Sequence, residues 1–486
     1  MFAQQLSLSV RTPGELVTKV AEDPRRTVIV LPELHSAAGP AAVGELIGEL
    51  LHLKHVRLVV EDRRGRASDI AHLHAAVMDL DQPQWIDPQR HTAWLAERQP
   101  TIPKRRRIAP APVIHLDDAA AVCGADPWHT TASFERAQDT HRGLRAAWLR
   151  AGAALIRDQT PADRALTLRA MLGEDADPRL PAELDALADT TDWQIAWTRV
   201  RGDTTPPWPG PVRALACGRG RSLGAVLVAD HQDTVRLVME ADATALGRLP
   251  GPVHAPRDLA VRPDGTALVL DAQGRLHVHA HLTGQGPTGL AALLHDGSTL
   301  EDELLDAVAG RLRAMPGTAI ASGTRPVAVG DATGQVHVFS QQYAPRSVPL
   351  HDGPVTALAA LEVREFGEPA ALTLFYSGGA DGRVRVWRQD SEPLPDPVAE
   401  RPGAVTALAA EHVEHGPALA IAWSDGLVEH RCLATGRVRT FRPGGPVAAL
   451  ALTSTGQLLV GTDHALVCLA PRRSRGPDRR IVTDGP

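Results

Sequence analysis

The feature that most constrains the fold of this chain is a strand pattern that recurs six times in its C-terminal half. Each repeat has a short apolar strand, a second strand that ends in an acidic turn, and a third strand. The turns before the third strands lie at Thr234, Gly274, Gly334, Gly382, Gly426 and His464. Four of the five intervals between these turns span 38 to 48 residues, which is close to the ~40–45 residues of a four-stranded propeller blade. The pattern therefore predicts an all-β propeller over 212–470 with six blades, and seven blades is the alternative.

The remaining interval, between Gly274 and Gly334, spans 60 residues and contains a segment with helical features. Ser298 offers a hydroxyl cap, acidic residues fill the first turn, and apolar residues then recur at spacings of three and four. The sequence predicts a helix at about 298–314, inserted between the second and third blades.

The fourth repeat contains the most informative motif. It begins His351-Asp-Gly-Pro-Val-Thr-Ala-Leu-Ala and ends Tyr376-Ser-Gly-Gly-Ala-Asp-Gly-Arg-Val-Arg-Val-Trp. This repeat resembles those of the WD40 β-propeller family. The resemblance implies a hydrogen-bonded tetrad inside the blade, formed by His351, Ser377, Asp381 and Trp387. Although His, Ser and Asp also occur in hydrolase triads, the spacing favours a structural role, in which the buried polar groups pair with one another.

The other five repeats depart from this motif. The position of the tryptophan is occupied by Met239, His279, Phe339, Arg431 and Leu469. A closed ring also needs a strand from outside the repeats, and the alternating segment from Trp193 to Val200 can supply it. We therefore predict a closing strand and a Pro-rich linker at 191–211, and a multidomain chain.

Residues 1–190 predict an α/β domain of unknown function with a helical C-terminal part. Strands are expected at 27–31, 56–60 and 112–116, and helices at 41–51, 142–157, 161–172 and 181–188. The first two strands and the helix between them suggest a βαβ unit with a parallel pair. The segment Asp126-Pro-Trp128 predicts a capped helix start whose tryptophan packs into the core.

Acidic residues or histidine follow each of the three predicted strands. They are Glu33, His35, Glu61, Asp62, Asp117 and Asp118. Ligands of open α/β sheets bind at the carboxyl ends of strands, so these residues are weak candidates for a catalytic metal or nucleotide site. The alternative is that they cap helices or face solvent, as Asp117 or Asp118 could do for the segment after them. The usual phosphate-binding and hydrolase motifs do not occur in the sequence.

Three histidines alternate along one predicted strand of the second blade, at positions 277, 279 and 281. His277, His279 and His281 would share a strand face, and such a set can bind Zn²⁺. A half-exposed blade strand is the alternative. We expect no metal and no cofactor.

Charge and composition place limits on function. The net charge is −6, three basic residues are lysine and 48 are arginine, and we attribute this bias to a GC-rich bacterial genome. The basic run at 104–107 is expected to be a solvated connector, which makes nucleic acid an improbable ligand. The sequence shows neither an apolar run that could span a bilayer nor a secretory signal. Four widely spaced cysteines predict reduced thiols and a cytoplasmic protein, and 471–486 is expected to be a disordered tail.

These observations predict a cytoplasmic scaffold or regulatory protein. The WD40 resemblance implies protein partners on the propeller faces and no membrane association. The alternative is an enzyme with a metal- or nucleotide-dependent N-terminal domain that the propeller targets.

Overall fold

The structure is a computed structural model that describes most of the chain after residue 113 and four short segments before it. The described residues are 13–22, 27–31, 40–53, 56–60, 114–157, 159–250, 255–280, 300–363 and 371–472. The chain divides into two compact units, Met1–Val113 and Ile114–Pro486.

The first unit contains a βαβ arrangement. Its described elements are α2 (Pro13–Glu22), β1 (Thr27–Leu31), α3 (Pro40–Leu51) and β2 (Val56–Val60). Strands β1 and β2 are parallel, with Ile29 opposite Leu58. Apolar residues of both helices pack with one face of this pair, which includes the buried Ile29 and Leu31. The order of these elements is the one expected from the alternation of apolar strand and amphipathic helix.

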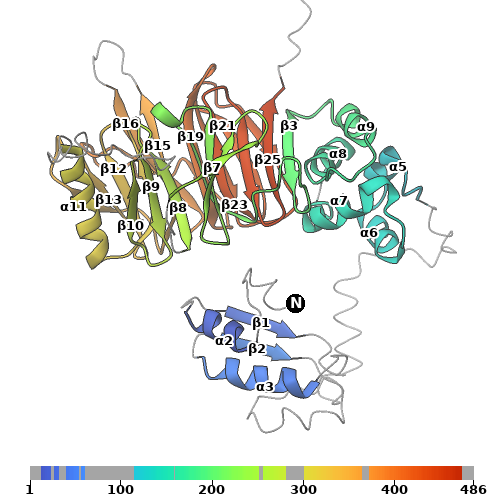
Figure 1. Ribbon diagram of the computed structural model, residues 1–486. Helices are drawn as coiled ribbons and strands as arrows, with labels where there is room; N and C mark the ends of the chain where they lie inside the picture. The colour runs from blue at the N-terminus through green and yellow to red at the C-terminus, as the bar shows by residue number, and fades with distance from the viewer. Residues whose placement is uncertain are drawn as a thin grey trace, which may run out of the picture. The chain divides into compact units, whose positions relative to one another are not determined.

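The second unit begins with a group of helices, which Figure 1 shows beside the propeller. They are α5 (Ala119–Gly124), α6 (Pro127–Arg136), α7 (Leu144–Ala151), α8 (Pro161–Ala170) and α9 (Leu180–Leu187), with short 3-10 turns at His141–Gly143 and Gly152–Ala154. Their buried residues form one apolar cluster with strands of the last two blades. We expected a domain boundary at residue 190, but the structure divides the chain between Val113 and Ile114. The helices belong with the propeller because they bury their apolar faces against it.

Two local expectations in this region were wrong. Residues 114–116 of the predicted strand 112–116 are not in a strand. They lead into α5, where the carboxylate of Asp118 accepts the backbone N–H groups of Ala120 and Ala121. Asp126 caps α6 as predicted, but Trp128 has an exposed fraction of 65% and does not pack into the core.

Six antiparallel sheets follow, and they are the blades of a propeller. Blade 1 contains β4 (Val212–Cys217), a 3-10 turn (Gly220–Ser222), β5 (Ala225–Asp230), β6 (Val235–Met239) and β7 (Ala245–Arg248); blade 2 contains β8 (Pro256–Val261), β9 (Ala267–Asp271) and β10 (Leu276–His279). Blade 3 contains β11 (Gly317–Ser322), β12 (Val327–Asp331), β13 (Gln335–Phe339) and β14 (Arg346–Pro349); blade 4 contains β15 (Val355–Val363), β16 (Leu372–Gly379), β17 (Arg383–Trp387) and β18 (Ala399–Glu400). Blade 5 contains β19 (Val405–Val413), β20 (Gly416–Trp423), β21 (Val428–Cys432) and β22 (Val438–Phe441); blade 6 contains β23 (Val447–Leu452), β24 (Leu458–Thr462), β25 (Ala465–Pro471) and β3 (Trp193–Val200).

The ring closes through β3, which is the fourth strand of blade 6 although it precedes blade 1 in the sequence. It pairs antiparallel with β25 along its length, from Trp193 opposite Pro471 to Val200 opposite Ala465. The first strands β4, β8, β11, β15, β19 and β23 contact one another in succession, and β23 contacts β4. Six blades and the predicted closing strand are therefore confirmed.

The longer second repeat contains the predicted helix. Helix α11 (Leu300–Ala314) buries Leu304, Val308 and Leu312 in the apolar cluster between blades 2 and 3. Within the described residues blade 2 has three strands, whereas each of the other blades has four. The inserted helix thus contributes to the packing between neighbouring blades.

A buried histidine replaces valine in blade 5. His430 lies four residues after the turn glycine Gly426. The equivalent position, four residues after the turn glycine, is Val338 in blade 3 and Val386 in blade 4. Its ring meets that of Trp193 edge-on at 5.4 Å, and neither ring nitrogen has a hydrogen-bond partner among the described residues. Burial, helped by nearby Arg439, lowers the pKa of His430 from 6.5 to about 4.

We expect His430→Val to stabilise the fold. At pH 7 the gain should be about 1 kcal/mol, because an unpaired buried polar group is removed. Below pH 6.5 the unfolded state of the wild type binds a proton that the folded state rejects, so its stability falls towards pH 4. The advantage of the variant should therefore grow by about 2 kcal/mol at pH 5. Urea unfolding at both pH values measures this, with the exposed His412→Val as control. An advantage that does not depend on pH would contradict a buried neutral imidazole.

Candidate functional site

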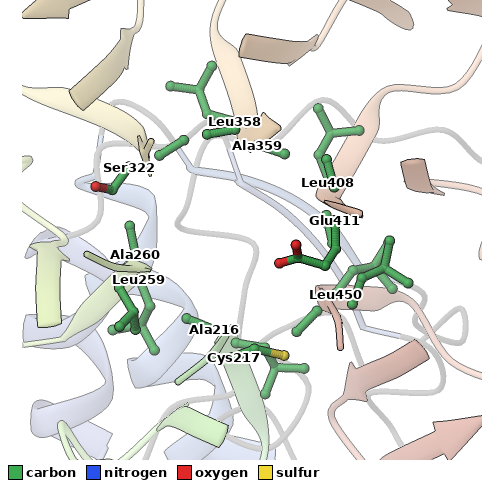
Figure 2. A pocket seen from close by; sticks show the side chains of 18 of the residues that line it. Ala216, Cys217, Leu259, Ala260, Ser322, Leu358, Ala359, Leu408, Glu411 and Leu450 are labelled. Atoms are coloured by element: carbon green, nitrogen blue, oxygen red, sulfur yellow. The ribbon is translucent and has the colours of Figure 1, made fainter. Parts of the chain in front are cut away.

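The first strands of the blades surround a central channel. It contains a pocket of about 100 Å³ whose wall is built from all six blades (Figure 2). One set of equivalent positions is large and aliphatic: Leu215, Leu259, Ile320, Leu358, Leu408 and Leu450. The next position in every blade is alanine: Ala216, Ala260, Ala321, Ala359, Ala409 and Ala451. The recurring Leu-Ala or Ile-Ala pair of the repeats therefore builds the channel.

An ion pair crosses the pocket at one end. Nη2 of Arg219, after β4 of blade 1, lies 3.2 Å from Oε2 of Glu411 on β19 of blade 5. The other carboxylate oxygen of Glu411 accepts the backbone N–H of His412 at 3.0 Å. Figure 2 shows the carboxylate of Glu411 directed into the pocket, with Cys217 and Ser322 on the wall. Two blades that are not neighbours in the ring are thus joined at the mouth of the channel.

Burial shifts the pKa values of several titratable groups near the channel. Burial raises the pKa of Cys217 well above its usual value, and the nearby carboxylates of Glu240 and Glu411 raise it further. Burial also raises the pKa of Glu240. Asp258 on β8 accepts the backbone N–H groups of Leu259 and Ile320, yet burial raises its pKa to about 6. The wall of the pocket itself carries one carboxylate, that of Glu411, and one guanidinium, that of Arg219, and these two groups form the ion pair.

The WD40-like motif of blade 4 forms a buried polar network. Nδ1 of His351 lies 3.1 Å from Oδ1 of Asp381, and its Nε2 lies 2.8 Å from Oγ of Ser377. Asp381 also accepts the backbone N–H groups of Asp352 and Arg383. Burial lowers the pKa of His351, and Asp381 partly opposes this effect.

Trp387 lies outside that network. Its indole N–H donates to the backbone carbonyl of Ser391 at 2.9 Å, and its ring packs in the core between blades 3 and 4. The implied tetrad is therefore a linked triad and a separately bonded tryptophan. Gly379 leaves room for the triad, because a Cβ there would lie 2.4 Å from both Asp381 Oδ1 and His351 Nδ1.

Blades 1 to 3 contain a different polar turn, which was not predicted from the sequence. An aspartate at the end of the second strand accepts a backbone N–H four residues later and bonds a basic side chain six residues later. The pairs are Asp230 with Arg236 at 2.8 Å, Asp271 with His277 at 2.7 Å, and Asp331 with His337 at 3.0 Å. The recurring spacing of six residues from acid to base was a usable signal.

This turn also explains His277, the first residue of the proposed zinc set. Its Nε2 bonds Asp271, as the equivalent His337 bonds Asp331. His279 is half-buried and its Nε2 has no partner among the described residues, while His281 lies outside them. Among the described residues no group of three or more His, Cys, Asp or Glu side chains is arranged to hold a metal ion.

The structure does not bring the acidic candidates of the N-terminal part into one described site. Glu33, His35, Glu61 and Asp62 lie outside the described residues. Asp118 caps α5, and Oδ1 of Asp117 lies 3.2 Å from Nδ1 of His141. The two candidates that can be placed therefore have local structural partners. The basic run at 104–107 also lies outside the described residues, as does the predicted tail after Arg472.

The two faces of the propeller differ in their exposed apolar residues. We call face A the face formed by the turns from first to second strand (218–224, 262–266, 323–326, 414–415 and 453–457) and from third to fourth strand (240–244, 340–345, 388–398 and 433–437). The large exposed apolar side chains of the described propeller all lie in these turns, at the strand ends beside them, or at the start of α11: Leu223, Met239, Leu246, Val278, Leu300, Tyr343, Leu394 and Val438. The channel end with Arg219 and Glu411 opens on the same face.

Comparison with known proteins gives similarity in structure alone. No family model matches the sequence, and no curated protein matches it. The chain in "Structure of U3-55K" matches 57% of this chain and 98% of its own length, with 15% identity and a TM-score of 0.34. The chain in "Crystal structure of RRP9 WD40 repeats" matches 58% and 100%, with 15% identity and a TM-score of 0.35.

The repeat motif, the polar triad of blade 4 and the closed ring of six blades agree with one another. The C-terminal part of the chain is a WD40-like β-propeller. In the described ranges, no helix has both the length and the apolar character that crossing a bilayer requires.

Proposed function

We propose that this chain is a protein-interaction scaffold in the cytoplasm and that its propeller binds a protein partner through face A. The observation that carries the proposal is a pair of large exposed apolar side chains, Tyr343 and Leu394, in two turns of face A that are hydrogen-bonded to each other. Exposed apolar groups that cluster on one surface mark interaction sites more often than scattered ones do. Propeller blades are rigid, so such a surface is already ordered before a partner binds. Binding therefore costs little conformational entropy on the propeller side.

Tyr343 and Leu394 are the best-supported contacts on face A. They lie in the third-to-fourth turns of blades 3 and 4, with exposed fractions of 55% and 58%. Nη1 of Arg346 donates to the carbonyls of Gln389 and Ser391, and the amide of Gln389 donates to the carbonyl of Ala344. The two turns are therefore bonded to each other, which restrains the backbone that carries both apolar side chains.

The proposal predicts that face A substitutions remove the partner. The tagged full-length chain and its double variant Tyr343→Ser/Leu394→Ser are each expressed in the native cytosol. The proteins that each one captures are compared by mass spectrometry. A specific partner of the wild type should be reduced at least about tenfold in the variant, because each apolar anchor contributes about 1–2 kcal/mol.

A matched control tests the opposite face. Asp352 lies in the turn between blades 3 and 4 there, and its side chain is exposed. Asp352→Ser should retain the partner. If both variants still capture the partner, or if residues 1–113 capture it without the propeller, binding through face A is contradicted.

A further inference from the structure

A cluster of buried nitrogen atoms without hydrogen-bond partners lies between blades 5 and 6. We propose that Trp193, His430 and Arg439 form a binding site for a carboxylate group, which we call the rim site. It lies at the outer rim of the propeller, because Arg439 is on β22 and Trp193 is on β3, the fourth strands of the two blades. None of the three residues lines the channel pocket, and the inference does not depend on the proposed function.

The three side chains of the rim site lie against one another. His430 and Arg439 are directly opposite each other on the paired strands β21 and β22, so their side chains share one face of blade 5. The ring of Trp193, from blade 6, meets the ring of His430 edge-on with the centroids 5.4 Å apart. The guanidinium carbon of Arg439 lies 5.9 Å from the centroid of the Trp193 ring. The two blades therefore bring one indole, one imidazole and one guanidinium together where they meet.

Each of these side chains has a buried nitrogen that needs a partner. Nε1 of Trp193, both ring nitrogens of His430 and Nε of Arg439 have no hydrogen-bond partner among the described residues. Trp193 and His430 have exposed fractions of only 1% and 4%, so bulk solvent does not satisfy them. A buried N–H group without an acceptor costs free energy, and several of them in one place are explained by a bound water or ion. One acceptor that takes N–H groups from all three side chains would remove this cost.

The charges at the rim site favour a negative group over a water molecule. Arg439 is the one charged group among the described residues that shifts the pKa of His430. Arg439 is itself repelled by Arg437 and attracted by Asp192 and Cys432, and its pKa is lowered chiefly by burial. The carboxylate of Asp192 is already bonded to Arg437, and the thiol of Cys432 donates to a backbone carbonyl at 3.7 Å. The positive charge of Arg439 is therefore incompletely balanced.

A carboxylate matches this set of donors. Its two oxygen atoms can accept N–H groups from a guanidinium and from a ring at the same time. Its single negative charge balances the single charge of Arg439, whereas phosphate would bring further negative charge into a partly buried site. The carboxylate can belong to a free small acid or to an acidic side chain of a protein partner, and the donors of the rim site suit both.

The rim site also gives a reason for a polar residue that weakens the fold. We expect His430→Val to stabilise the chain when no ligand is bound, because valine occupies the equivalent position in blades 3 and 4. Binding residues commonly cost stability, since their polar groups are paired only in the complex. Acetate should therefore stabilise the wild type more than His430→Val and narrow the difference between their urea midpoints.

The test uses acetate as the probe and the indole N–H of Trp193 as the reporter. The full-length chain with ¹⁵N-labelled tryptophans is titrated with sodium acetate at constant ionic strength, and Trp193→Phe identifies the resonance by removing it. We expect this resonance to shift with a dissociation constant on the order of 5 mM. Phosphate should bind at least about fivefold more weakly. A short neutral peptide with one glutamate distinguishes the two sources: affinity equal to that of acetate assigns the site to an acidic side chain, and weaker binding assigns it to a free acid.

Substitutions then test the residues of the rim site. Arg439→Gln should weaken acetate binding at least about tenfold and His430→Val about threefold, because each removes a donor to the carboxylate. Arg248→Gln changes an exposed arginine on β7, the outer strand of blade 1, and should leave the affinity unchanged. Urea unfolding shows that each variant is folded.

Two results would overturn the rim site. The first is a Trp193 resonance that acetate does not move, or an affinity that is the same in wild type, Arg439→Gln and His430→Val, which would assign the buried nitrogens to bound water. The second is a gain in acetate affinity of more than about tenfold in Cys432→Ser. That gain would mean that the thiolate of Cys432 is the group that balances Arg439 in the native protein.

Discussion

We expect the propeller to unfold at a much lower urea concentration when an aspartate replaces Ile195, a buried residue of the closing strand β3. The same substitution at the adjacent exposed residue, Gln194, should leave the urea midpoint almost unchanged. Ile195 and Gln194 are neighbours on β3, but Ile195 is buried in the core and Gln194 is exposed. Ile195→Asp should lower the free energy of unfolding by about 4 kcal/mol, because an unpaired carboxylate is buried and an apolar side chain is lost.

The matched variant and a truncation complete this test. Gln194→Asp should change stability by less than about 0.5 kcal/mol. Removal of residues 1–113 should leave the midpoint of the propeller transition unchanged, because the division between compact units lies there. Removal of residues 1–202 should abolish the cooperative transition, since β25 then lacks its partner strand and the helices are gone. A propeller that unfolds normally without β3 would contradict the closed ring of six blades.

The blades could be predicted because their signals are local. A turn glycine, an acidic residue and short apolar strands recur within about 45 residues, so each repeat reports its own structure. The inserted helix was predictable for the same reason, from its cap and its apolar spacing. The closing strand was predictable because a ring of repeats leaves one blade short of a strand.

The position of helices α5 to α9 could not be predicted from local signals. Their secondary structure follows from caps such as Thr160 and Asp126, which act over three residues. Their packing on the propeller depends on contacts such as that of Thr167 with the carbonyl of Arg442, which are 275 residues apart. Apolar periodicity shows that a helix needs a partner surface and does not show which one.

The channel and its ion pair were missed for a related reason. Arg219 and Glu411 lie 192 residues apart and belong to repeats that are not adjacent. Each is an ordinary turn or strand-end residue in its own repeat. Their proximity follows from the number of blades and the diameter of the ring, which no single repeat encodes.

Loss of the carboxylate in the polar triad of blade 4 is expected to cost about 3 kcal/mol. The carboxylate of Asp381 accepts three N–H groups, one of them from the fully buried ring of His351. In Asp381→Ala the ring nitrogen loses its partner and no solvent reaches it, so its full desolvation cost appears. Asp381→Asn keeps an acceptor oxygen and should recover more than half of the loss. Asp352→Ala, at an exposed neighbour, should cost less than about 0.5 kcal/mol.

The pH dependence of this difference identifies His351 as the partner. Burial lowers the pKa of His351 below 6.5, and Asp381 opposes that effect. Without Asp381 the folded pKa of His351 should fall further, so the variant should lose additional stability as the pH drops below 6.5. The pKa of Asp381 is itself below 3.8, because N–H groups and His351 outweigh its burial, so its charge persists over this range. Urea unfolding of wild type and Asp381→Ala at pH 7 and pH 5 should therefore show a gap that widens at pH 5. A constant gap would mean that Asp381 acts through the backbone N–H groups of Asp352 and Arg383 alone.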